Sequence, residues 1–337
     1  MSSPSWPTAA LLLGLAACTD PADRAAKQRI FSPEDPPAVV ASAKEKIDAN
    51  ELGNDPRLSH RVVTMGADEV AERLGAHKFT ADVSFEWASG GQRVKLSETR
   101  LLEAAAGGVG GDFHARIDNS RDQGLEVVRA HGQVFARNKY GKFRLRQRDR
   151  GIAERTRNDT AGALREVDSF FDGRLALVAK GSTTVEGRPA YRYDVHLSSA
   201  APHAAPASTP SPLPAATRTR MDEGTRRRQT FVEKRQPRDL SGELVVDAAS
   251  AVVLQAHVVG RLDVPGQGGP GPAELRVVLD QRIRDVGRAP TIKPPDGFLP
   301  DADKPEGLAD ALDRFGIPRS GRADAGVDTE ADDDPPG

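Results

Sequence analysis

Strict alternation of apolar and polar side chains, repeated in short segments, constrains the fold of this chain more than any other feature. In residues 79–87 (FTADVSFEW), every odd-numbered position is apolar and every even-numbered position is polar. A period of two is that of a β-strand with one buried and one solvated face. Ser89-Gly90-Gly91 then predicts a tight turn, and Val94-Lys95-Leu96-Ser97 begins the return strand.

The same pattern recurs along the chain between turns that are rich in Gly, Asn, Asp and Ser. Parallel strands need crossovers of a dozen or more residues, so connections as short as these predict an antiparallel meander. A strongly twisted sheet of about ten strands tends to curl. The further predicted strands cover residues 113–117, 125–129, 134–136, 143–146, 191–197, 242–247, 254–263 and 275–283.

Two segments have a helical period instead. Residues 67–74 carry acidic side chains in the first turn and are followed by Gly75, which predicts a short helix. A second, amphipathic helix is predicted after the cap Asn158-Asp159-Thr160, and Gly173 is a point at which it could divide into two. Its predicted apolar face consists of Leu164, Val167, Phe171, Leu175 and Val178.

These patterns together predict a mainly β (α+β) fold. One-sided strands need a cover for their apolar face, and a helical insertion supplies it. The predicted architecture is a curved antiparallel sheet of about ten strands, an open half-barrel, with the helical insertion on its concave face.

The N-terminus carries a second informative pattern. A short apolar run ends in Ala16-Ala17 directly before Cys18, the only cysteine among the 337 residues. The run is shorter than the ~20 residues that span a bilayer, and small residues behind a short apolar region are typical of a secretory signal. A cysteine at this place resembles the lipobox of bacterial lipoproteins, in which the thiol receives a diacylglyceryl group. Residues 1–7 depart from the pattern because they contain no Lys or Arg, and plain secretion and a structural cysteine remain alternatives.

Composition and charge divide the chain further. Apolar residues make up 38% of it, enough for a core, and an acylated Cys18 leaves no disulfide, so stability must come from burial. Residues 296–337 carry twelve acidic and four basic side chains, a composition typical of disorder. The predicted parts are a signal peptide (1–17), a lipidated flexible tether (18–60), a half-barrel domain (61–290, with an Ala/Pro-rich loop at 198–219) and an acidic disordered tail (291–337).

Two internal segments, with the N-terminal motif, resemble the periplasmic lipoprotein-carrier superfamily of LolA, LolB, LppX and LprG. The first is TVEGRPAYRY at residues 184–193, and the second is SGELVVD at residues 241–247, followed by Val252-Val253-Leu254. The lipobox is similar to that of LolB, LppX and LprG, and soluble LolA lacks it. The resemblance implies an apolar cavity between sheet and helices that holds acyl chains. At ~0.8 kcal/mol for each buried CH₂, one long chain gains on the order of 10 kcal/mol gross.

The candidate residues for lining such a cavity are aromatic side chains of the predicted strands: Phe85, Trp87, Phe113, Tyr191 and Tyr193. Each suits a packed interior equally well, and packed interiors are the rule in proteins. The sequence leaves both an open cavity and a solid core as interpretations.

The sequence shows no pattern of a catalytic, cofactor or metal site. The seven histidines lack ligand spacing, a cysteine-based zinc site is impossible, and neither a Gly-x-Ser-x-Gly elbow nor a P-loop occurs. We therefore expect no enzyme, no cofactor and no metal. The basic stretches at residues 144–148 and 226–228 are of the kind that anionic lipid headgroups attract, or they form a charged outer strand face.

The sequence thus predicts a non-enzymatic envelope lipoprotein, anchored to a membrane through Cys18, that binds or transfers lipid or lipoprotein acyl chains. Thr19 follows the cysteine, and in the enteric sorting rule Asp at that position retains a lipoprotein in the inner membrane, so the outer membrane facing the periplasm is favoured. The alternative is a structural or interaction lipoprotein with a solid core that binds an envelope protein. Nucleic acid is not an expected partner.

Overall fold

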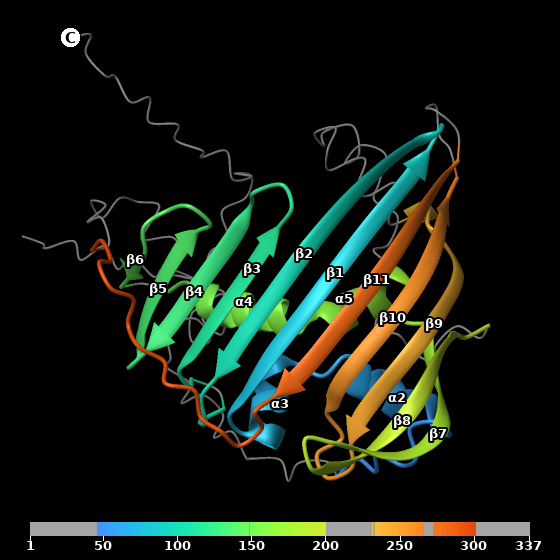
Figure 1. The fold of residues 1–337 in the computed structure, drawn as a ribbon, viewed down its shortest axis with the longest axis horizontal. Coiled ribbons are helices and arrows are strands. Elements are labelled where there is room, and N and C mark those ends of the chain that lie inside the picture. The colour runs from blue at the N-terminus through green and yellow to red at the C-terminus, as the bar shows by residue number, and fades with distance from the viewer. Residues whose placement is uncertain are drawn as a thin grey trace, which may run out of the picture. The chain divides into compact units, whose positions relative to one another are not determined.

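Eleven antiparallel strands form one curved, unclosed sheet in the part of the chain that the structure describes (Figure 1). The computed structural model describes residues 46–108, 110–147, 149–199, 231, 233–265 and 272–300. The strand order is β6-β5-β4-β3-β2-β1-β11-β10-β9-β8-β7, so two meanders join where β1 pairs with β11. The strands are β1 His77–Ser89, β2 Gln92–Ala104, β3 Phe113–Asn119, β4 Gly124–Ala130, β5 Gln133–Asn138, β6 Arg144–Arg146, β7 Leu175–Val185, β8 Arg188–Leu197, β9 Gln236–Asp247, β10 Val253–Val264 and β11 Ala273–Arg284.

Helices cover the concave face of this sheet. They are α2 Pro56–Val63, α3 Ala67–Leu74, α4 Ile152–Ala161 and α5 Ala163–Phe170, and Figure 1 shows them on one side of the strands. Alternation in β1 works as the sequence predicts, because Phe79, Ala81 and Val83 are buried beneath the helices while Thr80 and Asp82 are exposed. The predicted open half-barrel with helices on its concave face is therefore confirmed, and α3 has the bounds that the sequence predicts. No helix of the described residues is long and apolar enough to cross a membrane.

The second predicted helix is wrong at both ends. Helix α4 begins at Ile152, its break from α5 falls at Gly162, and Asn158-Asp159-Thr160 lie inside α4 and do not cap it. The chain leaves the helical conformation at Asp172 and Gly173, which have positive φ angles of 58° and 68°. Leu175 and Leu177 are buried as alternate residues of β7, whereas Val178 is exposed. Leu175 and Val178, which the sequence analysis assigns to the helical face, therefore belong to strand β7.

The folded domain is longer at both ends than the predicted range of residues 61–290. Ile47, Ala49 and Leu52 are buried in the core although they fall in the predicted tether, and Tyr193 Oη donates a hydrogen bond to the Ala49 carbonyl. At the other end, Leu299 accepts a hydrogen bond from the Leu145 backbone N–H at 2.9 Å. Apolar side chains in both segments find partners only in the folded chain. Cys18, the signal peptide, residues 200–219 of the loop and the tail from residue 301 lie outside the described residues.

A second, smaller core lies on the convex face of the sheet at β4 and β5. The segment after β11 runs across the ends of the strands towards β6 (Figure 1). Its Ile292 packs against Val128, Ala130 and Phe135, and the rings of Phe298 and Phe135 are 4.8 Å apart. At this end of the sheet, apolar side chains therefore occupy the face that is polar elsewhere.

The two segments that resemble the lipoprotein carriers meet through an ion pair. The Arg188 Nε and Nη2 atoms donate to the two Asp247 carboxylate oxygens at 2.8 and 2.9 Å. Asp247 also accepts hydrogen bonds from the Ser250 backbone N–H and hydroxyl, at 2.9 and 2.6 Å. Burial by itself raises the pKa of Asp247, but the hydrogen bonds from Arg188 and Ser250 outweigh it and hold that pKa below its usual value. The pair links the β7–β8 turn to the β9–β10 turn.

We expect Arg188→Gln to lower the free energy of unfolding by about 2 kcal/mol at neutral pH, because it leaves a buried carboxylate without its cation. This is below the cost for a fully buried pair because the Arg188 side chain is 34% exposed. The matched control is Arg192→Gln. Arg192 lies on the same strand as Arg188 and forms an exposed ion pair with Glu243. Its loss lowers the free energy of unfolding by less than about 1 kcal/mol. Chemical denaturation measures both variants, and equal losses would contradict the structural role of the Arg188 pair.

Candidate functional site

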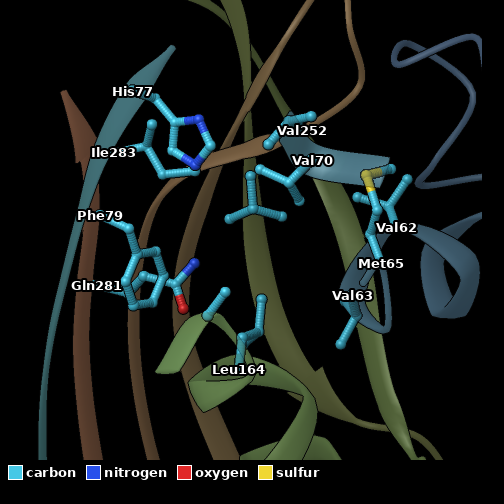
Figure 2. A pocket seen from close by; sticks show the side chains of 12 residues that line it. Val62, Val63, Met65, Val70, His77, Phe79, Leu164, Val252, Gln281 and Ile283 are labelled. Carbon is cyan, nitrogen blue, oxygen red and sulfur yellow. The ribbon is translucent and has the colours of Figure 1, made fainter. Parts of the chain in front are cut away.

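The interface between the helices and the concave face of the sheet contains a small apolar cavity. Its volume is about 30 Å³, and it lies between α2, α3 and the α4–α5 pair on one side and β1, β11 and the start of β10 on the other (Figure 2). Ten of the twelve side chains that line it are apolar, among them Val62, Met65, Val70, Phe79, Leu164 and Ile283. Amphipathic helices and one-sided strands both turn their apolar faces to this interface.

His77 and Gln281 are the polar residues of the cavity lining, and Figure 2 shows both projecting from the sheet toward the helices. His77 Nδ1 lies 2.9 Å from the Gly75 carbonyl oxygen, which assigns the proton to Nδ1 and leaves Nε2 as an acceptor. Burial lowers the pKa of His77, because it disfavours the charged ring more than the Gly75 carbonyl favours it. Gln281 is 6% exposed, and its Oε1 has no hydrogen-bond partner among the described residues. The cavity thus holds two buried acceptors.

The cavity is of the size that holds water, since a water molecule takes about 30 Å³ of liquid volume. Pockets that enclose drug-sized ligands measure roughly 300–1,000 Å³. In this conformation the interface is therefore packed, and an acyl chain needs separation of the helices from the sheet. A buried acceptor without a partner costs about 1–3 kcal/mol, so Gln281 favours the entry of a group that donates a hydrogen bond.

The five aromatic residues predicted from the sequence lie on the same face but do not line this cavity. Phe113 and Tyr193 are each 1% exposed and belong to the packed core, and the Arg157 guanidinium of α4 lies 5.5 Å from the centre of the Phe113 ring. Phe85, Trp87 and Tyr191 are partly buried and pack against that core. The five residues therefore belong to one core, Phe113 and Tyr193 inside it and the other three at its margin.

An aromatic cluster that the sequence analysis missed closes the concave face beyond the end of α5. The Phe170 ring lies 5.8 Å from Phe85 and 6.2 Å from Phe231, and Trp87 lies 6.4 Å from Phe231. Edge-on arrangements at such distances contribute about 0.5–1.5 kcal/mol each beyond area burial. The alternating pattern identified Phe85 and Trp87 as strand residues. Phe170 and Phe231 lie in helical segments, where no such alternation occurs.

A buried arginine ties helices α4 and α5 to the sheet. Arg100 of β2 donates to the Asp159 carbonyl oxygen at 2.6 Å and pairs with the Glu166 carboxylate. Its Nε also bonds Glu98 at 2.6 Å. Burial works against the charged guanidinium, but its two carboxylate partners raise the pKa of Arg100. This arrangement holds α4 and α5 in place over the sheet.

A histidine–aspartate pair joins helix α2 to α5. His60 Nδ1 lies 3.3 Å from Asp168 Oδ2, and the other Asp168 oxygen accepts the Leu175 backbone N–H at 3.1 Å. The hydrogen bond to Asp168 raises the pKa of His60, against the smaller effect of burial. The pair joins two helices that border the cavity, and its strength depends on the protonation of His60.

Replacement of His60 by Gln tests this pair. Protonated His60 stabilises the fold fully below about pH 6.5, its unfolded pKa, and this contribution disappears as the pH rises through the raised folded pKa. We therefore expect the variant to be less stable than the native protein at about pH 5.5 and to approach it in alkaline solution. The control is His196→Gln, an exposed strand histidine without an acidic partner in the described part of the chain. Denaturation curves across this range decide, and a pH-independent difference for His60→Gln would contradict the assignment.

The fold and cavity define a half-barrel with a helix-covered concave face. Neither a protein-family model nor a curated protein matches this chain. Among solved structures it is similar to LprF from Mycobacterium bovis (10% identity over 72% of this chain and 99% of that chain, TM-score 0.25). It is also similar to a DUF1329 family protein from Desulfovibrio piger (12%, 69% and 95%, TM-score 0.21) and to the LolA superfamily protein NE2245 from Nitrosomonas europaea (9%, 66% and 94%, TM-score 0.19). LolA superfamily proteins are thus among its structural neighbours, and the strand order of this chain itself defines the half-barrel.

Proposed function

We propose that this protein is a non-enzymatic envelope lipoprotein that binds an acyl chain of a lipid or lipoprotein between its sheet and helices α2 and α3. The observation that carries the proposal is the apolar cavity with two inward acceptors beneath these helices. The chain is anchored through acylated Cys18, and Thr19 favours the outer membrane, facing the periplasm.

Opening of the site begins with movement of α2, because α3 is also bonded to α4 and to the β9–β10 turn. Arg100 holds α4 and α5 on the sheet, while the His60–Asp168 pair that joins α2 to α5 is partly exposed. Separation of α2 and α3 exposes Val62, Met65 and Val70, and each ligand CH₂ that replaces this contact contributes ~0.8 kcal/mol. A hydroxyl or amide N–H on the ligand completes the hydrogen bonding of Gln281 Oε1.

A cavity-filling variant tests acyl-chain binding. Val70 of α3 lines the cavity and is half-buried, so Val70→Phe places a ring where the ligand would lie. We expect it to weaken saturable binding of a fluorescent long-chain fatty acid by about tenfold or more, a loss of ~1.4 kcal/mol. The control Val178→Phe, at an exposed position of β7, leaves binding unchanged. Circular dichroism verifies that both variants fold, and a native protein without saturable binding would contradict the proposal.

The anchor has its own test. After expression with the native signal, we expect radiolabelled palmitate to appear on the protein and to be absent from Cys18→Ala, because the thiol is the acylation site. The control is Ser2→Ala, which leaves the apolar run and Cys18 intact. Equal labelling of the native protein and Cys18→Ala would exclude Cys18 as the site of attachment.

The packed interior favours a second candidate function, an interaction lipoprotein that binds an envelope protein with a solid core. Phe113 and Tyr193 are fully buried, and the cavity measures only about 30 Å³. Native mass spectrometry separates the two functions, since a carrier retains co-purifying lipid. A pull-down with and without residues 301–337 then asks whether the acidic tail recruits a partner. The cut follows residue 300 because Leu299 pairs with β6 in the folded domain.

A further inference from the structure

A second pocket lies at the β6 edge of the sheet, away from the helix-covered cavity. It has a volume of about 420 Å³. Its apolar side chains are Leu125 of β4, Ala136 of β5 and Leu299, the residue that pairs with β6. The cations Lys142, Arg144 and Arg146 also line it. The pocket thus combines an apolar floor with a basic rim.

The strand register shows which face of the sheet carries these arginines. Arg144 pairs with Ala136 and Arg146 with Val134, and partners across a strand pair point to the same face. Ala136 and Val134 belong to the core of the concave face. The two arginines therefore lie on the concave face beyond the helices, and the sequence-based reading of residues 144–148 as a charged outer face is wrong for Arg144 and Arg146. The outward positions hold Leu145 and Phe143, which pack on the small convex core.

Three of the cations are uncompensated within the part of the chain that the structure describes. Lys142, Arg144 and Arg146 have no acidic partner among the described residues, and the buried Nε of Arg146 has no hydrogen-bond partner there. The fourth basic residue of the lining, Arg137, is neutralised by Glu126 at 2.6 Å and lies over the Phe143 ring. Concentrated positive charge over an apolar floor, with no carboxylate among the described lining residues, is the electrostatic complement of an anionic amphiphile.

We propose that this pocket binds a phosphate group, carried by an anionic phospholipid headgroup or by a soluble phosphate ester. Arg144 and Arg146 are two residues apart on one strand, a spacing of ~7 Å, so both guanidinium groups reach one phosphate and each can bind it through two N–H donors. Lys142 adds a point charge, and Leu125 and Leu299 contact the first carbons of the ester. The site is separate from the cavity beneath α2 and α3 and does not depend on acyl-chain binding there.

The acidic tail that follows Leu299 is the rival occupant. Its first carboxylate, Asp301, follows Leu299 by two residues in the sequence, and its first large apolar side chain is Leu308. The experiment therefore includes the tail as an outcome.

The test compares two triple variants of the full chain in a Cys18→Ser background, so that no acyl anchor contributes. The pocket variant is Lys142→Gln/Arg144→Gln/Arg146→Gln. The control, Arg276→Gln/Arg282→Gln/Arg284→Gln, removes the same charge from exposed positions of β11. Binding to phosphatidylcholine vesicles with and without phosphatidylglycerol is measured by sedimentation, and binding of inorganic phosphate and glycerol phosphate by calorimetry.

We expect the pocket variant to lose binding to phosphatidylglycerol vesicles by on the order of 100-fold, because each basic side chain near an anionic surface contributes a factor of about five. The control should lose much less. Phosphate or glycerol phosphate binding that depends on the pocket, without vesicle binding, supports the site and identifies the soluble source.

Three results would overturn the proposal. Equal losses in the two triple variants would mean that net charge alone drives binding. Absence of pocket-dependent binding to every probe would exclude a phosphate site. The same measurements are made after deletion of residues 301–337. Pocket-dependent binding that appears only in this shortened chain would mean that the acidic tail occupies the pocket in the full chain.

Discussion

Burial of the concave face of the sheet beneath its helices is the constraint on which the rest of the structure depends. With a single cysteine the chain cannot form an internal disulfide, so packing of apolar side chains has to supply its stability. Inward side chains in the middle of the sheet are fully buried, with Val258 of β10 and Val277 and Leu279 of β11 at 0% exposure. Whatever binds at this interface competes with contacts that hold the fold together.

Polar contacts then decide which parts of the cover are fixed. Arg100 ties α4 and α5 to β2, and Arg188 with Asp247 locks two turns at the other end of the sheet. Helix α2 has the weaker link, a His60–Asp168 pair whose strength depends on protonation. Helix α3 is tied to α4 by the Arg157–Asp68 ion pair and by the Ala67 N–H to Asn158 bond. This difference gives α2 the lowest cost of opening among the helices that border the small cavity.

The two candidate sites differ in chemistry because one lies beneath the helices and the other lies beyond them, on the uncovered part of the concave face. Beneath the cover, apolar side chains and two neutral acceptors suit an acyl chain that carries a hydrogen-bond donor. Beyond it, the same concave face continues onto β5 and β6 with an open basic pocket. An amphiphile has one part that fits each environment, although nothing requires one molecule to occupy both.

The sequence by itself determined ten of the eleven strands of the half-barrel, all but β7, because alternation such as that of residues 79–87 reflects a local period that survives in any antiparallel sheet. It failed where local pattern is ambiguous: Leu175 and Leu177 fit a helical face as well as a strand, and Ile47 and Ile292 carry no period. It identified the aromatic residues of the concave face, but not that Phe113 and Tyr193 fill the core. Only the tertiary structure shows that Gln281 Oε1 has no hydrogen-bond partner among the described residues. It also shows that Arg144 and Arg146 lie on the concave face. Those features depend on which segments of the chain pack on each face of the sheet. Contacts between residues far apart in the sequence determine that packing.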